Sequence, residues 1–387
     1  DYGQNRSRKA RMTRRIKSLA AMAAILCITA TPVFAQTVYT GDKMDGAAVI
    51  DRLDVTDLPT GSVTKLYFRV TDTSIGQGWY VPVIVVKGAK PGPKLLITAG
   101  IHGDELNGIS VLQHLAQSID PKMLSGTLVA VPGLNTPGLL HSTRGFTADE
   151  IGTNGENLNR VMPGHAEGGP ASRYAGRLWH QIFIGNADFA IDLHTQSRGG
   201  SYPGYVFAQT SAARQIADLL RPDVIGMDAG VEGTVENMLN PAGIPAVTYE
   251  LGGPEKFDDA MITRATRGIH NVMIGKGMLA GKPDLSDPAP FVGNVVTDID
   301  SPRGGWATVK VKLKDDVKKG DVLATVSNPF GETIATITAP SDGHVLSLAT
   351  DPRTEPGDMV VRLIAWSDKG VCAQTGCPET AQMVKSQ

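Results

Sequence analysis

The chain lacks the excess of positive charge that nucleic-acid binding requires. Its 387 residues contain 37 Lys and Arg against 39 Asp and Glu. Seven of those basic residues and one acidic residue fall in 1–35, so the remainder holds 30 basic against 38 acidic side chains, a net charge of −8. No basic stripe remains to bind phosphates. We therefore expect no nucleic-acid partner.

Long apolar runs are also missing. The run "LAAMAAILCITA" (19–30) is shorter than the roughly 20 residues that span a bilayer, and no stop-transfer pattern follows it. It follows the basic stretch "MTRRIKS", which starts at Met12, and it precedes the small residues Val33 and Ala35. Residues 1–35 are thus predicted to be an over-long start followed by a secretory signal peptide, cleaved ahead of Gln36. We expect a periplasmic or secreted protein without a stable membrane anchor.

Cysteine is rare, with three residues in the chain. Cys27 lies in the predicted signal peptide, and Cys372 and Cys377 lie in "CAQTGC", within a tail at 368–387. This spacing differs from the CxxC of thiol redox centres. In an oxidising compartment the pair is a candidate for a small-loop disulfide.

What the chain does contain is typical of a globular protein, with 41% hydrophobic and 20% charged residues. Its length favours two domains. Continuous apolar runs predict strands that are buried on both faces, hence an α/β fold with a mixed, mostly parallel sheet flanked by helices over residues 36–280. The predicted strands are 81–86, 94–99, 127–131, 189–193 and 245–251, and the predicted helices are 107–117, 172–184, 211–220 and 258–279.

After "GKPDLSDPAP" (281–290) the helical pattern stops, and 281–367 is predicted to be an all-β domain. "VKKGDVLATV" (317–326) and "TEPGDMVVRL" (354–363) form a weak repeat that places Gly-Asp before an apolar strand. With "APSDGHVL" between its halves, this region resembles the barrel-sandwich hybrid fold of biotinyl and lipoyl domains. The hairpin "VSNPFGETI" has no lysine that would carry a cofactor, so we expect a structural domain or a wall of the active site.

The segment "AGIHGDELNG" (99–108) places His102 and Glu105 three residues apart after a predicted strand. Catalytic zinc sites use three nitrogen or carboxylate ligands and leave a fourth position for water. An HxxE match alone is weak evidence, because polar turns produce it by chance. A third ligand is needed.

The other candidates share one property, which is that each follows a predicted strand. The carboxyl ends of parallel strands form the crevice in which ligands bind, so these segments are expected to meet at one edge of the sheet. They are His194 in "IDLHT", Glu250 in "YELGG", and Arg144 beyond the "NTPG" turn.

The chemistry of each side chain suggests a role for each candidate residue. His102, Glu105 and His194 are predicted to bind one Zn²⁺ per chain, which polarises a carbonyl and activates water. Glu250 is the predicted general base and acid. Asp192 shares a strand face with His194 and either orients its imidazole or makes a structural hydrogen bond.

Arginine binds carboxylates in a bidentate manner, and a cation near a metal can stabilise an oxyanion. Two arginines lie in the Gly- and Asn-rich stretch 141–164. "NLNR" predicts that Asn159 and Arg160 bind a substrate carboxylate, with Arg144 at the oxyanion. The roles of Tyr202 and Tyr205 in "SYPGYVF" stay open between lining the pocket and packing on a strand.

Together, "GIHGDELNG", "NLNR", "DLH" and "YELGG" resemble motifs of the succinylglutamate desuccinylase/aspartoacylase family, a branch of the zinc carboxypeptidase superfamily. The resemblance covers roughly residues 80 to 365 and implies a zinc carboxypeptidase-like fold with the same ligands, base and substrate residues. The family's substrate motif usually begins with Asp, where this chain has Asn157. The signal peptide is a second departure, since the best-known members act inside cells.

These observations predict an exported zinc-dependent hydrolase of a linear amide, acting on an N-acyl amino acid. A periplasmic metallocarboxypeptidase acting on short peptides or peptidoglycan stem peptides would use the same residues. A third alternative is a non-catalytic binding protein, which would be expected to have lost a ligand or the base.

Overall fold

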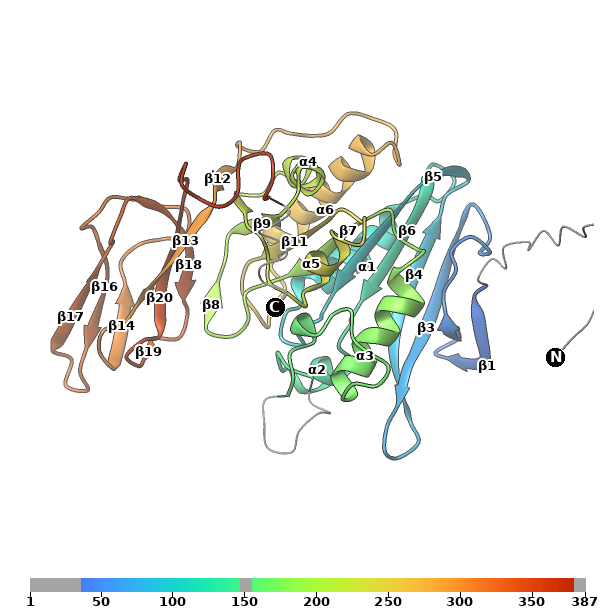
Figure 1. Cartoon of the computed structure of the whole chain (residues 1–387), viewed down its shortest axis with the longest axis horizontal. Helices are drawn as coiled ribbons and strands as arrows, with labels where there is room; N and C mark the ends of the chain where they lie inside the picture. Colours follow the sequence, from blue (N-terminus) through green and yellow to red (C-terminus); the bar gives the residue numbers. More distant parts are fainter. Residues whose placement is uncertain (1–35, 147–154, 379–387) are drawn as a thin grey trace, which may run out of the picture. The chain divides into compact units, whose positions relative to one another are not determined.

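The fold is built on a mixed sheet of eleven strands (Figure 1). The computed structural model describes residues 36–146 and 155–378, so the predicted signal peptide lies outside the described residues. At the centre of the sheet, four parallel strands lie in the order β6-β5-β7-β11, and each contains an apolar run that the sequence predicts. They are β5 (Lys90–Ala99), β6 (Ser125–Pro132), β7 (Phe189–His194) and β11 (Ala246–Leu251).

Antiparallel pairings extend the sheet on both sides of this centre. Strand β4 (Gly78–Lys87) pairs with β6, and β9 (Gly204–Ala208) pairs with β11. The mixed, mostly parallel sheet is thus confirmed, but its edges were not predicted, because their strands are short or partly exposed. These edge strands are β1 (Val38–Met44), β2 (Ala47–Arg52), β3 (Ser62–Asp72), β10 (Val224–Met227) and β12 (Phe291–Gly293).

Helices cover both faces of the sheet, as the continuous apolar strands predict. Along β5, Leu95 and Ile97 belong to one buried cluster and Leu96 to another, because successive side chains point to opposite faces. The first cluster includes residues of α1, α4 and α6, and the second includes residues of α3 and α5. These helices are α1 (Asn107–Ser118), α3 (Pro170–Leu178), α4 (Ser211–Leu220), α5 (Val235–Leu239) and α6 (Asp259–Gly275); α2 (Thr136–His141) follows β6.

Two predicted helix ends differ from the structure. The helix predicted at 258–279 ends at Gly275, because the chain turns at Gly277, whose φ of +74° suits glycine. The helix predicted at 172–184 begins at Pro170 and continues past Leu178 as a π-helical turn, η2 (Trp179–Phe183). Neither change moves a candidate site residue.

The C-terminal region forms two small sheets around its own apolar core. The first has the order β13-β20-β18-β15, and the second β17-β16-β14-β19. Strand pairing links this region to the large sheet, since β8 (Gly200–Ser201) pairs with β18 and β12 joins β10. The strands are β13 (Val295–Asp300), β14 (Gly305–Val309), β15 (Asp316–Val317), β16 (Val322–Ser327), β17 (Thr333–Thr338), β18 (Gly343–Ala349), β19 (Arg353–Thr354) and β20 (Met359–Ala365).

The predicted repeat appears as two equivalent turns. Gly320 and Gly357 have nearly the same φ, +95° and +94°. In each turn the following aspartate, Asp321 or Asp358, accepts a hydrogen bond of 2.8 Å from a backbone N–H three residues earlier. Each Gly-Asp pair therefore forms the same kind of turn before a strand.

Residues 372–377 form the small disulfide loop that the sequence suggested. Cys372 and Cys377 are bonded, and the N–H of Cys377 donates to the carbonyl of Gln209 at 2.8 Å. Over the described ranges, no helix combines the length and the apolar character that crossing a membrane requires.

Helix α1 links the packed sheet to the candidate site, because the helix begins two residues after Glu105. A Cβ on Gly108 would lie 2.6 Å from the Cβ of Leu193 and 3.1 Å from that of Ala99. Helix α1 thus approaches β5 and β7 too closely for any side chain at this position.

We expect Gly108→Val to lower the free energy of unfolding by about 1–3 kcal/mol, because overpacking shifts α1 away from the sheet. Urea denaturation measures the change. Gln117→Ala, at an exposed position of the same helix, is the control and should remain within about 0.5 kcal/mol of the original chain. Equal stability of the two variants would contradict the close packing.

Candidate active site

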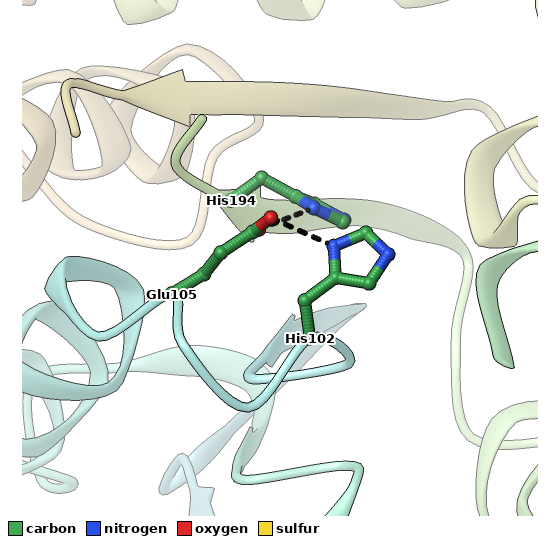
Figure 2. A group of neighbouring side chains, drawn as sticks. All are labelled: His102, Glu105 and His194. Atoms are coloured by element: carbon green, nitrogen blue, oxygen red, sulfur yellow. Dashed lines mark hydrogen bonds and ion pairs between the residues drawn. The ribbon is translucent and has the colours of Figure 1, made fainter. Parts of the chain in front are cut away.

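His102, Glu105 and His194 meet at the carboxyl edge of β5 and β7. His102 and Glu105 lie in the loop after β5, and His194 is the last residue of β7, the parallel neighbour of β5. The Nδ1 atoms of His102 and His194 lie 2.8 and 2.9 Å from the two carboxylate oxygens of Glu105 (Figure 2). All three side chains are buried, and their ligand atoms lie within 4.8 Å of one another.

The Nε2 atom of each imidazole lies within hydrogen-bond distance of an oxygen acceptor. The Nε2 of His194 lies 2.8 Å from Asp192 Oδ2, whose other oxygen accepts from Thr98 Oγ1. The Nε2 of His102 lies 3.1 Å from Asn157 Oδ1. That amide oxygen also accepts from the N–H of Asn159, which identifies it as the acceptor. Both imidazoles are therefore protonated at Nε2.

With Nε2 as a donor in both rings, the two Nδ1 atoms face the Glu105 carboxylate, and this arrangement requires a positive charge, either a proton on an imidazole or a metal ion. Burial lowers the pKa of His102. Burial acts in the same direction on His194, but Asp192 and Glu105 outweigh it and raise its pKa well above the usual value. Two nitrogens and one carboxylate, with oriented outer partners, fit a zinc ion.

Glu105 has further partners that the sequence did not indicate. Its Oε1 accepts hydrogen bonds from Ser197 Oγ at 2.7 Å and from Arg144 at 3.2 Å, and its Oε2 accepts from the N–H of Thr195 at 3.2 Å. Thr195 and Ser197 follow His194 directly, but nothing in "HTQS" distinguishes them from an ordinary polar turn. They orient the carboxylate that contacts both histidines.

The predicted anion-binding residues lie at the same cavity. Asn159 accepts a 2.9 Å hydrogen bond from the N–H of Val235 through Oδ1, which turns the amide so that Nδ2 remains the donor. Arg160 donates to the carbonyl of Asn159 at 2.6 Å. Burial and the charge of Arg144 both lower the pKa of Arg160. Because the two guanidinium groups repel each other, an anion between them would be stabilising.

Glu250 lies in β11, opposite His194 in the strand register. Its side chain is 8% exposed, and its Oε2 has no hydrogen-bond partner in the described part of the chain. Burial raises the pKa of this carboxyl to about 8. A buried carboxyl group whose pKa lies near neutrality is well suited to accept and return a proton.

One cavity of about 490 Å³ is lined by all seven predicted site residues. Tyr202 and Tyr205 line it too, and both also pack in a small apolar cluster with Leu346, so both parts of their open assignment hold. The C-terminal region supplies Val296, Leu346 and Arg362 and is therefore a wall of the cavity.

A second buried acid in this cavity, Glu236, was not predicted. Its Oε2 accepts from Thr248 Oγ1 at 2.8 Å. Thr234 Oγ1 lies 2.8 Å from both Glu236 Oε1 and the carbonyl of Val231, yet the hydroxyl has one proton. Both contacts are hydrogen bonds if Thr234 donates to the carbonyl of Val231 and a protonated Glu236 donates to Thr234 Oγ1. This geometry favours the protonated form of Glu236, and burial raises its pKa in the same direction.

We expect Glu236→Gln to leave the free energy of unfolding at pH 7 within about 1 kcal/mol of the original, because an amide donates and accepts as the neutral acid does. Glu236→Ala should cost about 1–3 kcal/mol, since it leaves two buried hydroxyls without this partner. Urea denaturation compares the two. A loss with Gln as large as with Ala would show that the carboxyl is ionised.

Residues 91–275 match the model of the succinylglutamate desuccinylase/aspartoacylase catalytic domain. An N-alpha-acetyl-L-2,4-diaminobutyric acid deacetylase from Halomonas elongata is 26% identical over 306 residues, which cover 75% of this chain and 86% of that protein.

Solved structures share the fold. A succinylglutamate desuccinylase/aspartoacylase from Rhodobacter sphaeroides superposes with a TM-score of 0.70 at 21% identity, covering 81% of this chain and 98% of the other. A product-bound ectoine utilization protein from Ruegeria pomeroyi has a TM-score of 0.69 at 22% identity, covering 80% and 98%. The matched residues contain the His102, Glu105 and His194 cluster, Arg144, Arg160 and Glu250. Residues 91–275 are therefore similar to the catalytic domain of the succinylglutamate desuccinylase/aspartoacylase family, the family that the four motifs resemble.

Proposed function

We propose that the protein is a zinc-dependent amidohydrolase that removes the acyl group from an N-acyl amino acid. The observation that carries the proposal is the single cavity in which a His-Glu-His cluster, a buried carboxylate and two arginines face one another. The 26% identical relative is a deacetylase of an N-acetylated amino acid, which supports this substrate class.

The polar groups of the cavity give the substrate an orientation. Arg160 and the amide Nδ2 of Asn159 would bind the α-carboxylate, because both present donors that have no partner among the described residues. Arg144 lies between Arg160 and the histidine cluster, in contact with Glu105. The scissile amide, one bond from the α-carbon, would then lie beside Arg144 and Glu250.

His102, Glu105 and His194 would hold the zinc ion, which when bound supplies Lewis acidity and lowers the pKa of water. Glu250 takes the proton of the attacking water and returns it to the amide nitrogen as the amine departs. Arg144 donates to the oxygen that becomes negative in the transition state. Asp192 and Asn157 keep the imidazoles in the Nε2–H form.

We expect Glu250→Gln to lower kcat on N-acyl amino acids by about 10²–10⁴-fold, because the amide cannot accept the proton of water. The variant should still bind one zinc per chain, since Glu250 is not in the ligand cluster. Release of primary amine measures activity, and metal analysis after dialysis measures zinc. Glu332→Gln, exposed on a hairpin of the C-terminal region, is the matched control.

The test includes N-acetyl amino acids, N-succinyl amino acids and short peptides as substrates. Hydrolysis of peptides alone would replace the proposal with a carboxypeptidase. Full activity of the Glu250→Gln protein would remove the assigned base. Zinc binding without hydrolysis of any substrate would favour a binding protein.

We also propose that the protein is exported and matures at Gln36. The signal-like sequence at 12–35 supports this, and so does the Cys372–Cys377 disulfide, because such bonds persist in oxidising compartments. Fractionation of cells that express the chain, with N-terminal sequencing, should find a mature periplasmic form that starts at Gln36. A full-length form confined to the cytoplasm would contradict the proposal.

A further inference from the structure

A buried row of polar side chains crosses the sheet next to the site residues. Thr98, Asp192 and Thr248 are register partners on β5, β7 and β11, and none is more than 4% exposed. Asp192 and Thr248 stand two residues before His194 and Glu250, so each points to the same face of the sheet as the site residue that follows it. The row therefore lies beside the candidate metal ligands and the proposed base.

The row leads to two different parts of the site. Thr98 Oγ1 donates to Asp192 Oδ1 at 2.6 Å, and the other oxygen of Asp192 lies 2.8 Å from His194 Nε2. Thr248 Oγ1 instead donates to Glu236 Oε2 at 2.8 Å. Glu236 is the second residue of α5 and is 5% exposed. Thr248 and Glu236 thus join the central sheet to α5, apart from the branch that reaches His194.

The other oxygen of Glu236 contacts the turn 231–234, which precedes α5. Glu236 Oε1 lies 2.8 Å from Thr234 Oγ1, and that hydroxyl donates to the carbonyl of Val231 at 2.8 Å. The backbone N–H of Thr234 donates to the same carbonyl at 3.3 Å. Glu236 therefore connects this turn to Thr248 on β11.

The turn 231–234 packs on the segment that carries Asn159 and Arg160. The N–H of Val235 donates to Asn159 Oδ1 at 2.9 Å, and the N–H of Met162 donates to the carbonyl of Gly233 at 3.0 Å. A Cβ on Gly233 would lie 2.2 Å from the carbonyl oxygen of Arg160, so the two backbones are in direct contact. The position of the turn therefore sets the position of Asn159 and Arg160.

We propose that Glu236 is a positioning residue for recognition of the substrate carboxylate. The inference rests on the proposed deacylase function, in which Asn159 and Arg160 bind that carboxylate. Glu236 acts through the turn 231–234: it ties the turn to the central sheet and so keeps Asn159 and Arg160 at a fixed distance from Glu250. A substrate held by its carboxylate then presents its amide at a constant place relative to the base.

The test compares an N-acetyl amino acid with its carboxamide, which lacks the carboxylate, on the full zinc-loaded chain. We expect the original chain to prefer the carboxylate by at least about tenfold in kcat/KM. Glu236→Ala should lower this preference about tenfold, mainly through a higher KM for the carboxylate, because the interaction lost is with a group that does not react. A purely structural defect would lower the activity on both compounds equally.

Two further variants test the hydrogen bonds of Glu236. Glu236→Gln should keep the preference within about twofold, because the amide accepts from Thr248 and donates to Thr234 as a protonated acid does. Thr248→Val removes the hydroxyl that donates to Glu236 and should lower the preference in the same direction as Glu236→Ala.

Asn186→Ala is the matched control for loss of stability. The Asn186 amide also makes buried hydrogen bonds, with backbone groups of Leu53, Val55 and Ile182. It precedes β7, at the end of that strand opposite His194. We expect the variant to unfold at a lower urea concentration and to keep the preference for the carboxylate unchanged.

Hydrogen exchange gives a second readout that does not depend on activity. Glu236→Ala should speed the exchange of the Val235 and Met162 amide hydrogens by at least about tenfold, because both donate across the contact that Glu236 holds in place. Exchange in α1 should stay the same. Unchanged exchange at both amides would overturn the positioning role.

The outcomes separate this inference from the proposed function. A carboxylate preference that is unchanged in Glu236→Ala, or lost equally in Glu236→Gln, would overturn the role of Glu236 and leave the deacylase intact. If no N-acyl amino acid is hydrolysed, the deacylase fails, and calorimetric titration with the same two compounds decides the role. Loss of the carboxylate preference in Glu236→Ala then supports it; an unaffected preference, or none in the original chain, overturns it.

Discussion

The buried carboxylate of Glu105 is the interaction on which the site depends. A buried charge is costly unless it is paired and hydrogen-bonded, and Glu105 satisfies this requirement with partners from three segments of the chain. Both of its oxygens face an imidazole, and Ser197, Arg144 and the N–H of Thr195 complete its contacts. The loop after β5, the end of β7 and the loop that follows α2 are thus held together around one group.

Parallel strands make this convergence possible. Strands β5, β7 and β11 end at one edge of the sheet, so His102, His194 and Glu250 become neighbours although up to 148 residues separate them. The close approach of α1 at Gly108 brings Glu105 to the same edge. The strands and the loops that follow them therefore both place site residues at fixed positions along this edge.

The cavity contains three glutamates in different electrostatic surroundings. Glu105 is paired with imidazoles, Glu250 is buried with one oxygen that has no hydrogen-bond partner among the described residues, and Glu236 contacts two threonine hydroxyls. The different surroundings of these three glutamates lower the pKa of Glu105 and raise those of Glu250 and Glu236. The C-terminal sheets contribute a fourth kind of surface, apolar side chains around an arginine that is already neutralised by Asp298.

The sequence by itself determined the central strands, the main helices and the candidates for ligands, base and arginines. Apolar runs fix buried strands, and residues such as His102, His194 and Glu250 stand next to them in the chain, so local pattern was sufficient. Only the tertiary structure decided the partners of these residues. Tyr202 and Arg362 are 160 residues apart, Ser197 and Glu105 are 92 apart, and Glu236 has nothing distinctive around it in the sequence. Their roles follow from burial and from hydrogen-bond geometry across segments, and no local pattern encodes either property.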